Sequence, residues 1–159
     1  LWGIQMSLTV EDGSGVPEAE SYVSVAAADQ HFSAIPDHPW GQADENVKES
    51  ALKRAAVYAD MFTYPGARKK AAQGLKWPRA GAIDEEGRSL SGLPSALQSA
   101  VFEMAGQYIS TGTDERQISR EKIGQIEISY ERRKAGPSFA FRLLSLIGAT
   151  AKSRELSRG

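Results

Sequence analysis

Apolar side chains recur at helical spacing between residues 43 and 62, in the segment ADENVKESALKRAAVYADMF. At 3.6 residues per turn they form one stripe, and the charged side chains lie mostly on the other side. Asp44 or Asn46 can supply the N-cap, and Pro65-Gly66 ends the segment. The pattern predicts an amphipathic helix whose apolar stripe comprises Val47, Ala51, Leu52, Ala55, Tyr58, Ala59 and Phe62.

Three more segments favour helix. Ser24 can cap a short helix that begins at Val25, and Pro94 suits the first turn of a helix over 93–110. A last helix is predicted over 136–149. The stripe of the 93–110 helix comprises Leu97, Val101, Met104, Ala105 and Tyr108, and that of the last helix comprises Phe139, Leu143, Leu146 and Ile147.

The period changes to that of a strand near residue 126. Ile126, Ile128 and Tyr130 alternate with polar residues, and Gly124 could make the turn that joins them to residues 118–123. A single hairpin is only marginally stable in water. It would therefore need a partner surface, in this chain or in another.

The connection over residues 64–93 has little periodicity and contains the stretch GLKWPRAG. Connections this long are usually functional or disordered, and the large Trp77 ring argues against simple disorder. The predicted fold class is mainly α, a small helical domain with about four helices, this long WPR-containing loop and one β-hairpin. We expect one domain over 8–149, with a disordered or non-native N-terminus (1–7) and a flexible basic tail (150–159).

Composition narrows the class of protein. Apolar residues make up 41% and charged residues 25%, as in soluble globular proteins. The absence of cysteine excludes disulfides, thiolate catalysis and cysteine-ligated zinc from this sequence. No apolar run is long enough for a membrane span, so no membrane partner is expected. The net charge of −1 is uneven, because residues 1–113 carry 9 basic and 14 acidic side chains and residues 114–159 carry 10 and 6. Such asymmetry either steers a partner or reflects chance.

No set of residues with catalytic or metal-binding spacing can be assembled. His31 and His38 are the only histidines, and neither has a partner at ligand spacing. The acidic glycine-containing arm over 11–22 is typical of a flexible turn rather than a phosphate loop. The segment DEEGRS (84–89) is typical of a hairpin-like turn rather than a calcium loop. The sequence therefore predicts a protein that is not an enzyme, with no cofactor and no metal.

Basic clusters keep nucleic-acid binding open. One is Arg68-Lys69-Lys70, followed by Trp77, and the other is Arg132-Arg133-Lys134, preceded by Tyr130. Cations beside aromatic rings can track phosphates and stack bases, although short basic clusters are more often solvated surface. Arg68, Lys69 and Lys70 are the candidate DNA-facing residues.

The order of motifs resembles a known family. VEDGSGVPEAESYVSV, ALKRAAVYAD, GLKWPRAG, LPSALQSAVFEMA and EKIGQIEISY follow one another, over roughly residues 8–148. They resemble phage and prophage proteins labelled putative DnaT-like single-stranded DNA-binding proteins, which look like head-to-tail connectors. The resemblance implies a virion protein that forms a ring, usually dodecameric, beneath the portal. Its partners would be copies of itself, the portal protein, tail or stopper proteins, and DNA that passes through the channel.

Two alternatives remain. One is a single-stranded DNA-binding accessory protein of phage replication, and the other is a prophage interaction module without DNA contact. The DNA-binding alternative is favoured over the connector if one groove with exposed aromatics is lined by Lys69, Lys70, Arg132 and Arg133.

Several residues are candidates for an interface or for anchoring the long loop. We expect Trp77 to plug the domain's own core, Pro78 to set the local backbone, and Arg79 to reach a carboxylate or a chain end. The full set of candidates is Tyr22, Trp77, Pro78, Arg79, Ile126, Ile128, Tyr130, Arg132 and Arg133.

Overall fold

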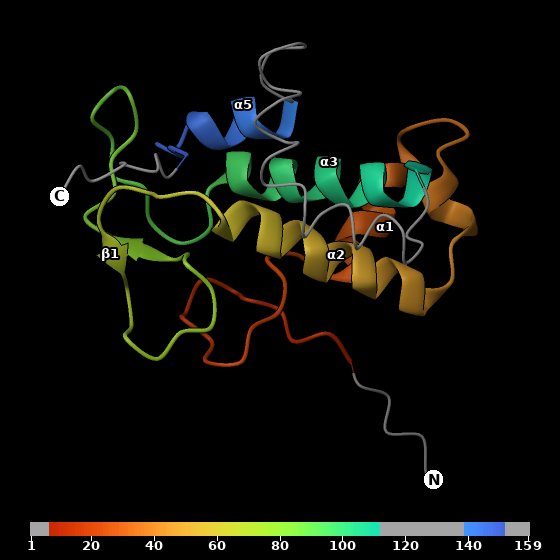
Figure 1. Ribbon diagram of the computed structural model, residues 1–159, viewed down its shortest axis with the longest axis horizontal. Helices are drawn as coiled ribbons and strands as arrows, with labels where there is room; N and C mark the ends of the chain where they lie inside the picture. Colours follow the sequence, from red (N-terminus) through yellow and green to blue (C-terminus); the bar gives the residue numbers. More distant parts are fainter. Residues whose placement is uncertain (1–6, 112–138, 152–159) are drawn as a thin grey trace, which may run out of the picture.

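The computed structural model describes residues 7–111 and 139–151 (Figure 1). Within them the fold is mainly α, as predicted, with four α-helices, one 3-10 turn and one pair of short strands. In chain order these elements are α1 (Val25–Ser33), η1 (Pro39–Gln42), α2 (Glu45–Asp60), β1 (Ala67–Arg68), β2 (Arg79–Ala80), α3 (Ser95–Thr111) and α5 (Phe139–Ser145). No helix in these two ranges has the length and apolar character that crossing a membrane requires.

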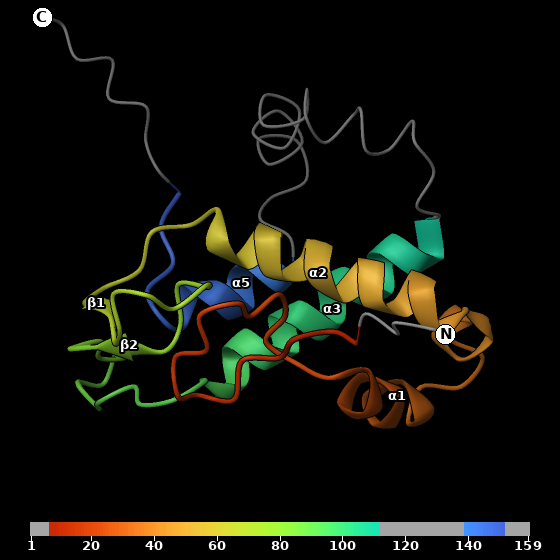
Figure 2. The ribbon, with the colours of Figure 1, turned by 90° about the horizontal axis from the view of Figure 1, so that it is seen from below.

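The antiparallel pair β1–β2 lies inside the long WPR-containing loop, with Ala67 opposite Ala80 and Arg68 opposite Arg79. The hairpin that the sequence predicts, over residues 118–131, lies outside the described residues. The WPR-containing loop, which carries β1 and β2, is therefore an ordered part of the domain, and it packs at one end of the helices (Figure 2).

The antiparallel pair α2 and α3 forms the centre of the domain, and α5 lies on α3 (Figure 1). Both predicted stripes are largely buried, which confirms the helical periods. Val47 and Tyr108 are the exceptions, because Val47 is exposed and Tyr108 is only half-buried. Small residues at the contacts of α3 with its neighbouring helices let the helices approach closely. At Gly106, for example, a Cβ atom would stand 2.9 Å from the Phe32 ring of α1.

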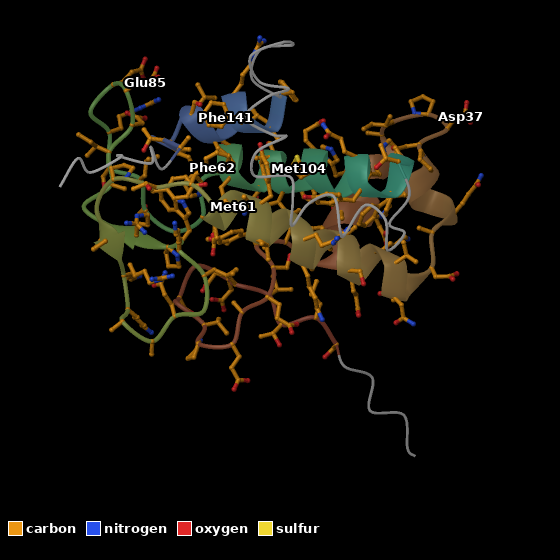
Figure 3. All side chains as sticks on the ribbon, viewed as in Figure 1. Asp37, Met61, Phe62, Glu85, Met104 and Phe141 are labelled. Atoms are coloured by element: carbon orange, nitrogen blue, oxygen red, sulfur yellow. The ribbon has the colours of Figure 1, made fainter. Side chains whose placement is uncertain are left out.

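The predicted buried stripe of the last helix is only partly correct, because Ile147 is buried and Leu143 is half-buried but the other two members are exposed. Ala140, Leu144 and Ile147 face the core, whereas Phe139 and Leu146 are 57% and 51% exposed. Five of the seven residues of α5 are apolar and are spread around the helix, so its sequence allows more than one buried face. Packing decides among them, because small Ala140 permits close contact with α3 and Phe141 meets the Phe62 ring with centroids 5.1 Å apart (Figure 3).

The arm over residues 11–22 folds back onto its own domain. The Glu11 side chain is buried and accepts hydrogen bonds from the backbone N–H groups of Gly13, Gly15 and Val16 at 2.8, 3.0 and 2.7 Å. Glu11 N–H also donates to the Ser21 carbonyl at 2.8 Å. The predicted flexible turn is thus a turn held by hydrogen bonds, and the amides that could cradle a phosphate already hold this carboxylate.

Candidate nucleic-acid interface

Trp77 fills the core beneath the long loop. Its side chain is fully buried, and its ring meets the Tyr64 ring edge to face with centroids 5.5 Å apart. Pro78 is buried beside it. The prediction that Trp77 packs in its own domain is confirmed, so this ring cannot stack on a base.

Tyr22 connects three segments that are far apart in the sequence. Its hydroxyl donates to the Asp60 carboxylate at the end of α2 and accepts from the Trp77 backbone N–H at 3.2 Å. The other carboxylate oxygen of Asp60 accepts from Lys76 N–H at 3.1 Å. Burial raises the pKa of both the Tyr22 phenol and the Asp60 carboxyl, because burial disfavours their charged forms.

Arg79 binds the backbone and not a carboxylate. Its guanidinium donates to the carbonyls of Tyr64, Pro65, Gly66 and Lys76 at 2.7 to 3.3 Å. Partial burial lowers its pKa. The prediction that Arg79 reaches a carboxylate is therefore wrong. The planar guanidinium satisfies carbonyls that follow α2, which joins this segment to β2.

Gln73 holds the loop between β1 and β2. Its side-chain amide donates to the carbonyls of Leu75 and Pro78 at 2.8 and 2.9 Å, and its carbonyl accepts from Lys70 N–H at 2.9 Å. Lys69 N–H donates to the Pro78 carbonyl at 3.0 Å. These bonds fix the backbone that presents the basic cluster.

Arg68, Lys69 and Lys70, which we call the basic loop, are all exposed. Arg68 Nε approaches the Leu75 carbonyl at 3.4 Å. No salt bridge to the Lys69 or Lys70 ammonium groups is present in the described part of the chain. The two lysines thus offer charge to a partner from a fixed backbone.

The structure does not bring the predicted aromatics to this loop. Tyr22, Tyr64 and Trp77 are buried, and Phe139 is the only Phe, Tyr or Trp in residues 7–111 and 139–151 that is more than a third exposed. The candidates Ile126, Ile128, Tyr130, Arg132 and Arg133 lie outside the described residues. The groove that would combine both basic clusters therefore stays a prediction.

Neither of two hollows on the described surface offers an unpaired cation. A cleft of about 440 Å³ lies between the 84–90 loop, the start of α3 and the end of α5, and a second, of about 360 Å³, lies beside Glu11. Arg88 in the first cleft pairs with Asp84 at 2.9 Å and Glu86 at 2.8 Å. The predicted turn at 84–89 is confirmed by pairing of Ile83 with Ser89. No cluster of possible metal ligands occurs within the residues that the structure describes.

Sequence reasoning missed Glu11, Asp60 and Gln73 as anchors of these loops. The position of Asp60 in the sequence did indicate such a role. A carboxylate in the last turn of a helix interacts unfavourably with the helix dipole, so a tertiary contact is expected to stabilise it. Nothing in the local sequence marks Gln73, whose three partners are set by the loop's path.

The comparisons with known proteins give a family. Neither the curated proteins nor the solved structures include a match to this chain. A family model matches residues 6–154, and its description is "Putative DnaT-like ssDNA binding protein". That description overturns the expected head-to-tail connector role, because it names single-stranded DNA binding, and it gives no support to a ring or to portal and tail partners. Since the match covers almost the whole sequence, the chain belongs to the family of DnaT-like single-stranded DNA-binding proteins.

Proposed function

We propose that this chain binds single-stranded DNA as an accessory protein, without catalysing a reaction. The observation that carries the proposal is the family match over residues 6–154. The basic loop supports it, because Lys69 and Lys70 are exposed and form no salt bridge among the described residues. Phosphate contacts from such lysines are independent of base sequence.

The proposed contact is with the DNA backbone. Two ammonium groups on a fixed loop can each neutralise a phosphate and release its counterions. The slightly acidic net charge of the chain favours modest affinity over tight binding. Single strands should be preferred where bases also contribute contacts, because a duplex hides their faces.

Fluorescence anisotropy with labelled oligothymidylate, titrated at several salt concentrations, tests the proposal. Lys69→Ala should weaken binding and reduce the slope of log K against log salt by about 0.7, the value for one lost contact to a single strand. Lys53→Ala is the matched control, because it removes the same charge from α2, where Lys53 pairs with Glu20 at 3.6 Å.

Two results would contradict the proposal. Wild-type protein that binds no oligothymidylate at low salt would exclude the function. Equal slopes for wild type and for a Lys69→Ala/Lys70→Ala variant would exclude the basic loop as the contact and leave the function to another surface.

A further inference from the structure

The outer face of α5 carries an aromatic side chain beside a cation. Phe139 is 57% exposed, and Arg142 follows three positions later and is also exposed. Residues three apart on a helix are neighbours on its surface. No salt bridge involving Arg142 is present in the part of the chain that the structure describes. Both groups are available to a ligand.

The inner contacts of α5 prevent the helix from turning this face inward. Ala140 and Leu144 are fully buried, and the Phe141 ring packs on Phe62 at the end of α2. Rotating the helix to bury Phe139 would expose these residues instead. The exposed ring is therefore a consequence of the fold.

We infer that Phe139 and Arg142 form a base-stacking platform for single-stranded DNA, an inference that rests on the proposed function. A base can lie on the free face of the Phe139 ring, and the Arg142 guanidinium can meet the adjoining phosphate. Stacking of this kind accepts every base, because all bases have a π-face. The platform supplies the aromatic contact that the basic loop lacks.

The platform and the basic loop belong to one packed unit. Thr150, shortly after α5, exchanges two backbone hydrogen bonds of 2.9 Å with Thr63. Gly148 lies so close to Pro65 that a Cβ atom would stand 2.7 Å from the proline ring. Arg68 follows Pro65 by three residues, so the end of α5 and the start of the basic loop are held together.

The face fits a nucleic-acid strand better than a purely apolar partner because a cation follows the ring by one turn. Leu146 is also exposed, at 51%, and it lies at the cleft near the 84–90 loop. An apolar protein partner would use Leu146 and Phe139 alike. Base stacking needs the aromatic ring of Phe139 and not the Leu146 side chain, and this difference makes Leu146 a matched control.

The experiment compares two labelled oligomers of about 16 nucleotides, the upper end of typical site sizes, one oligothymidylate and one abasic throughout. Wild-type protein should bind the abasic oligomer on the order of ten-fold more weakly, because stacking is lost. Phe139→Ala should weaken binding to oligothymidylate by a similar factor and abolish the preference for bases. Phe139→Trp should retain the preference, and Leu146→Ala should leave it unchanged.

The outcomes separate this inference from the proposed function. A wild-type protein that binds both oligomers equally, or a Phe139→Ala variant that keeps the base preference, overturns the platform while the function stands. Equal losses in Phe139→Ala and Leu146→Ala also overturn it, because binding would then not depend on the aromatic ring. Failure of wild-type protein to bind either oligomer overturns the function and the platform together. Circular dichroism of each variant confirms that it is folded.

Discussion

Tyr22 and Asp60 are separated by 38 positions in the sequence, yet the Tyr22 hydroxyl donates a hydrogen bond to the Asp60 carboxylate. Tyr22 is 1% exposed, and its oxygen also accepts from Trp77 N–H. This contact joins the arm, the end of α2 and the WPR-containing loop. The loop that presents Lys69 and Lys70 is thus fixed by buried polar groups at some distance from its tip.

Tyr22→Phe should lower the free energy of unfolding by about 1–3 kcal/mol, the cost of unpaired buried polar groups. The variant keeps the ring but leaves Trp77 N–H without an acceptor and removes a donor from Asp60. Urea unfolding followed by tryptophan fluorescence measures the loss. A variant as stable as wild type would show that water replaces the hydroxyl without penalty.

Stability should carry a pH dependence that comes from Asp60. Burial raises its folded-state pKa above the ordinary 3.8, although hydrogen bonds from Tyr22 and Lys76 partly oppose this. The folded state therefore binds the proton more tightly than the unfolded state. This contribution to stability is fully present below the ordinary pKa and is lost as pH rises through the raised value.

A carboxyl NMR titration of the folded protein measures the midpoint directly, and we expect it above 3.8 for Asp60. Asp12 is an internal reference with the opposite sign, because a hydrogen bond from the Ser14 side chain, the leading cause, lowers its pKa. In Tyr22→Phe the Asp60 midpoint should move higher still. A wild-type midpoint at or below the ordinary value would contradict this assignment.

Trp77→Ala should cost about 3–5 kcal/mol, as for other large buried aromatics, because it leaves a cavity under the loop. Trp77→Phe should cost less, because the buried indole N–H that it removes has no hydrogen-bond partner among the described residues. Thermal and urea unfolding provide the measurement. Val57→Ala is the control, because Val57 is 63% exposed and its loss should stay within about 0.5 kcal/mol.

Arg79→Lys tests the structural role of the guanidinium while keeping its charge. Lysine keeps the charge but cannot reach four carbonyls in one plane, so the free energy of unfolding should fall by about 1–3 kcal/mol. The salt dependence of DNA binding should stay unchanged, since the number of neutralised phosphates does not change. Stability equal to that of wild type would contradict this structural role of the guanidinium.

The sequence by itself determined those features that depend on neighbouring residues. The stripes of α2 and α3 follow from a period of 3.6, and Ser24 caps α1 through a hydrogen bond to Ala27 N–H at 3.0 Å. The turn at 84–89 follows from Asp84, whose carboxylate accepts from the backbone of Glu86 and Arg88. Each of these is a local choice that the chain makes within a few residues.

Only the tertiary structure decided the face of α5 and the anchors of the loops. Five of the seven residues of α5 are apolar, so contact with α3 and Phe62 selects which side is buried and leaves Phe139 and Arg142 outside. Asp60 meets its partners Tyr22 and Lys76 across 38 and 16 positions. Periodicity and turn rules carry no information at such separations, because the pairing exists only once packing has brought the segments together.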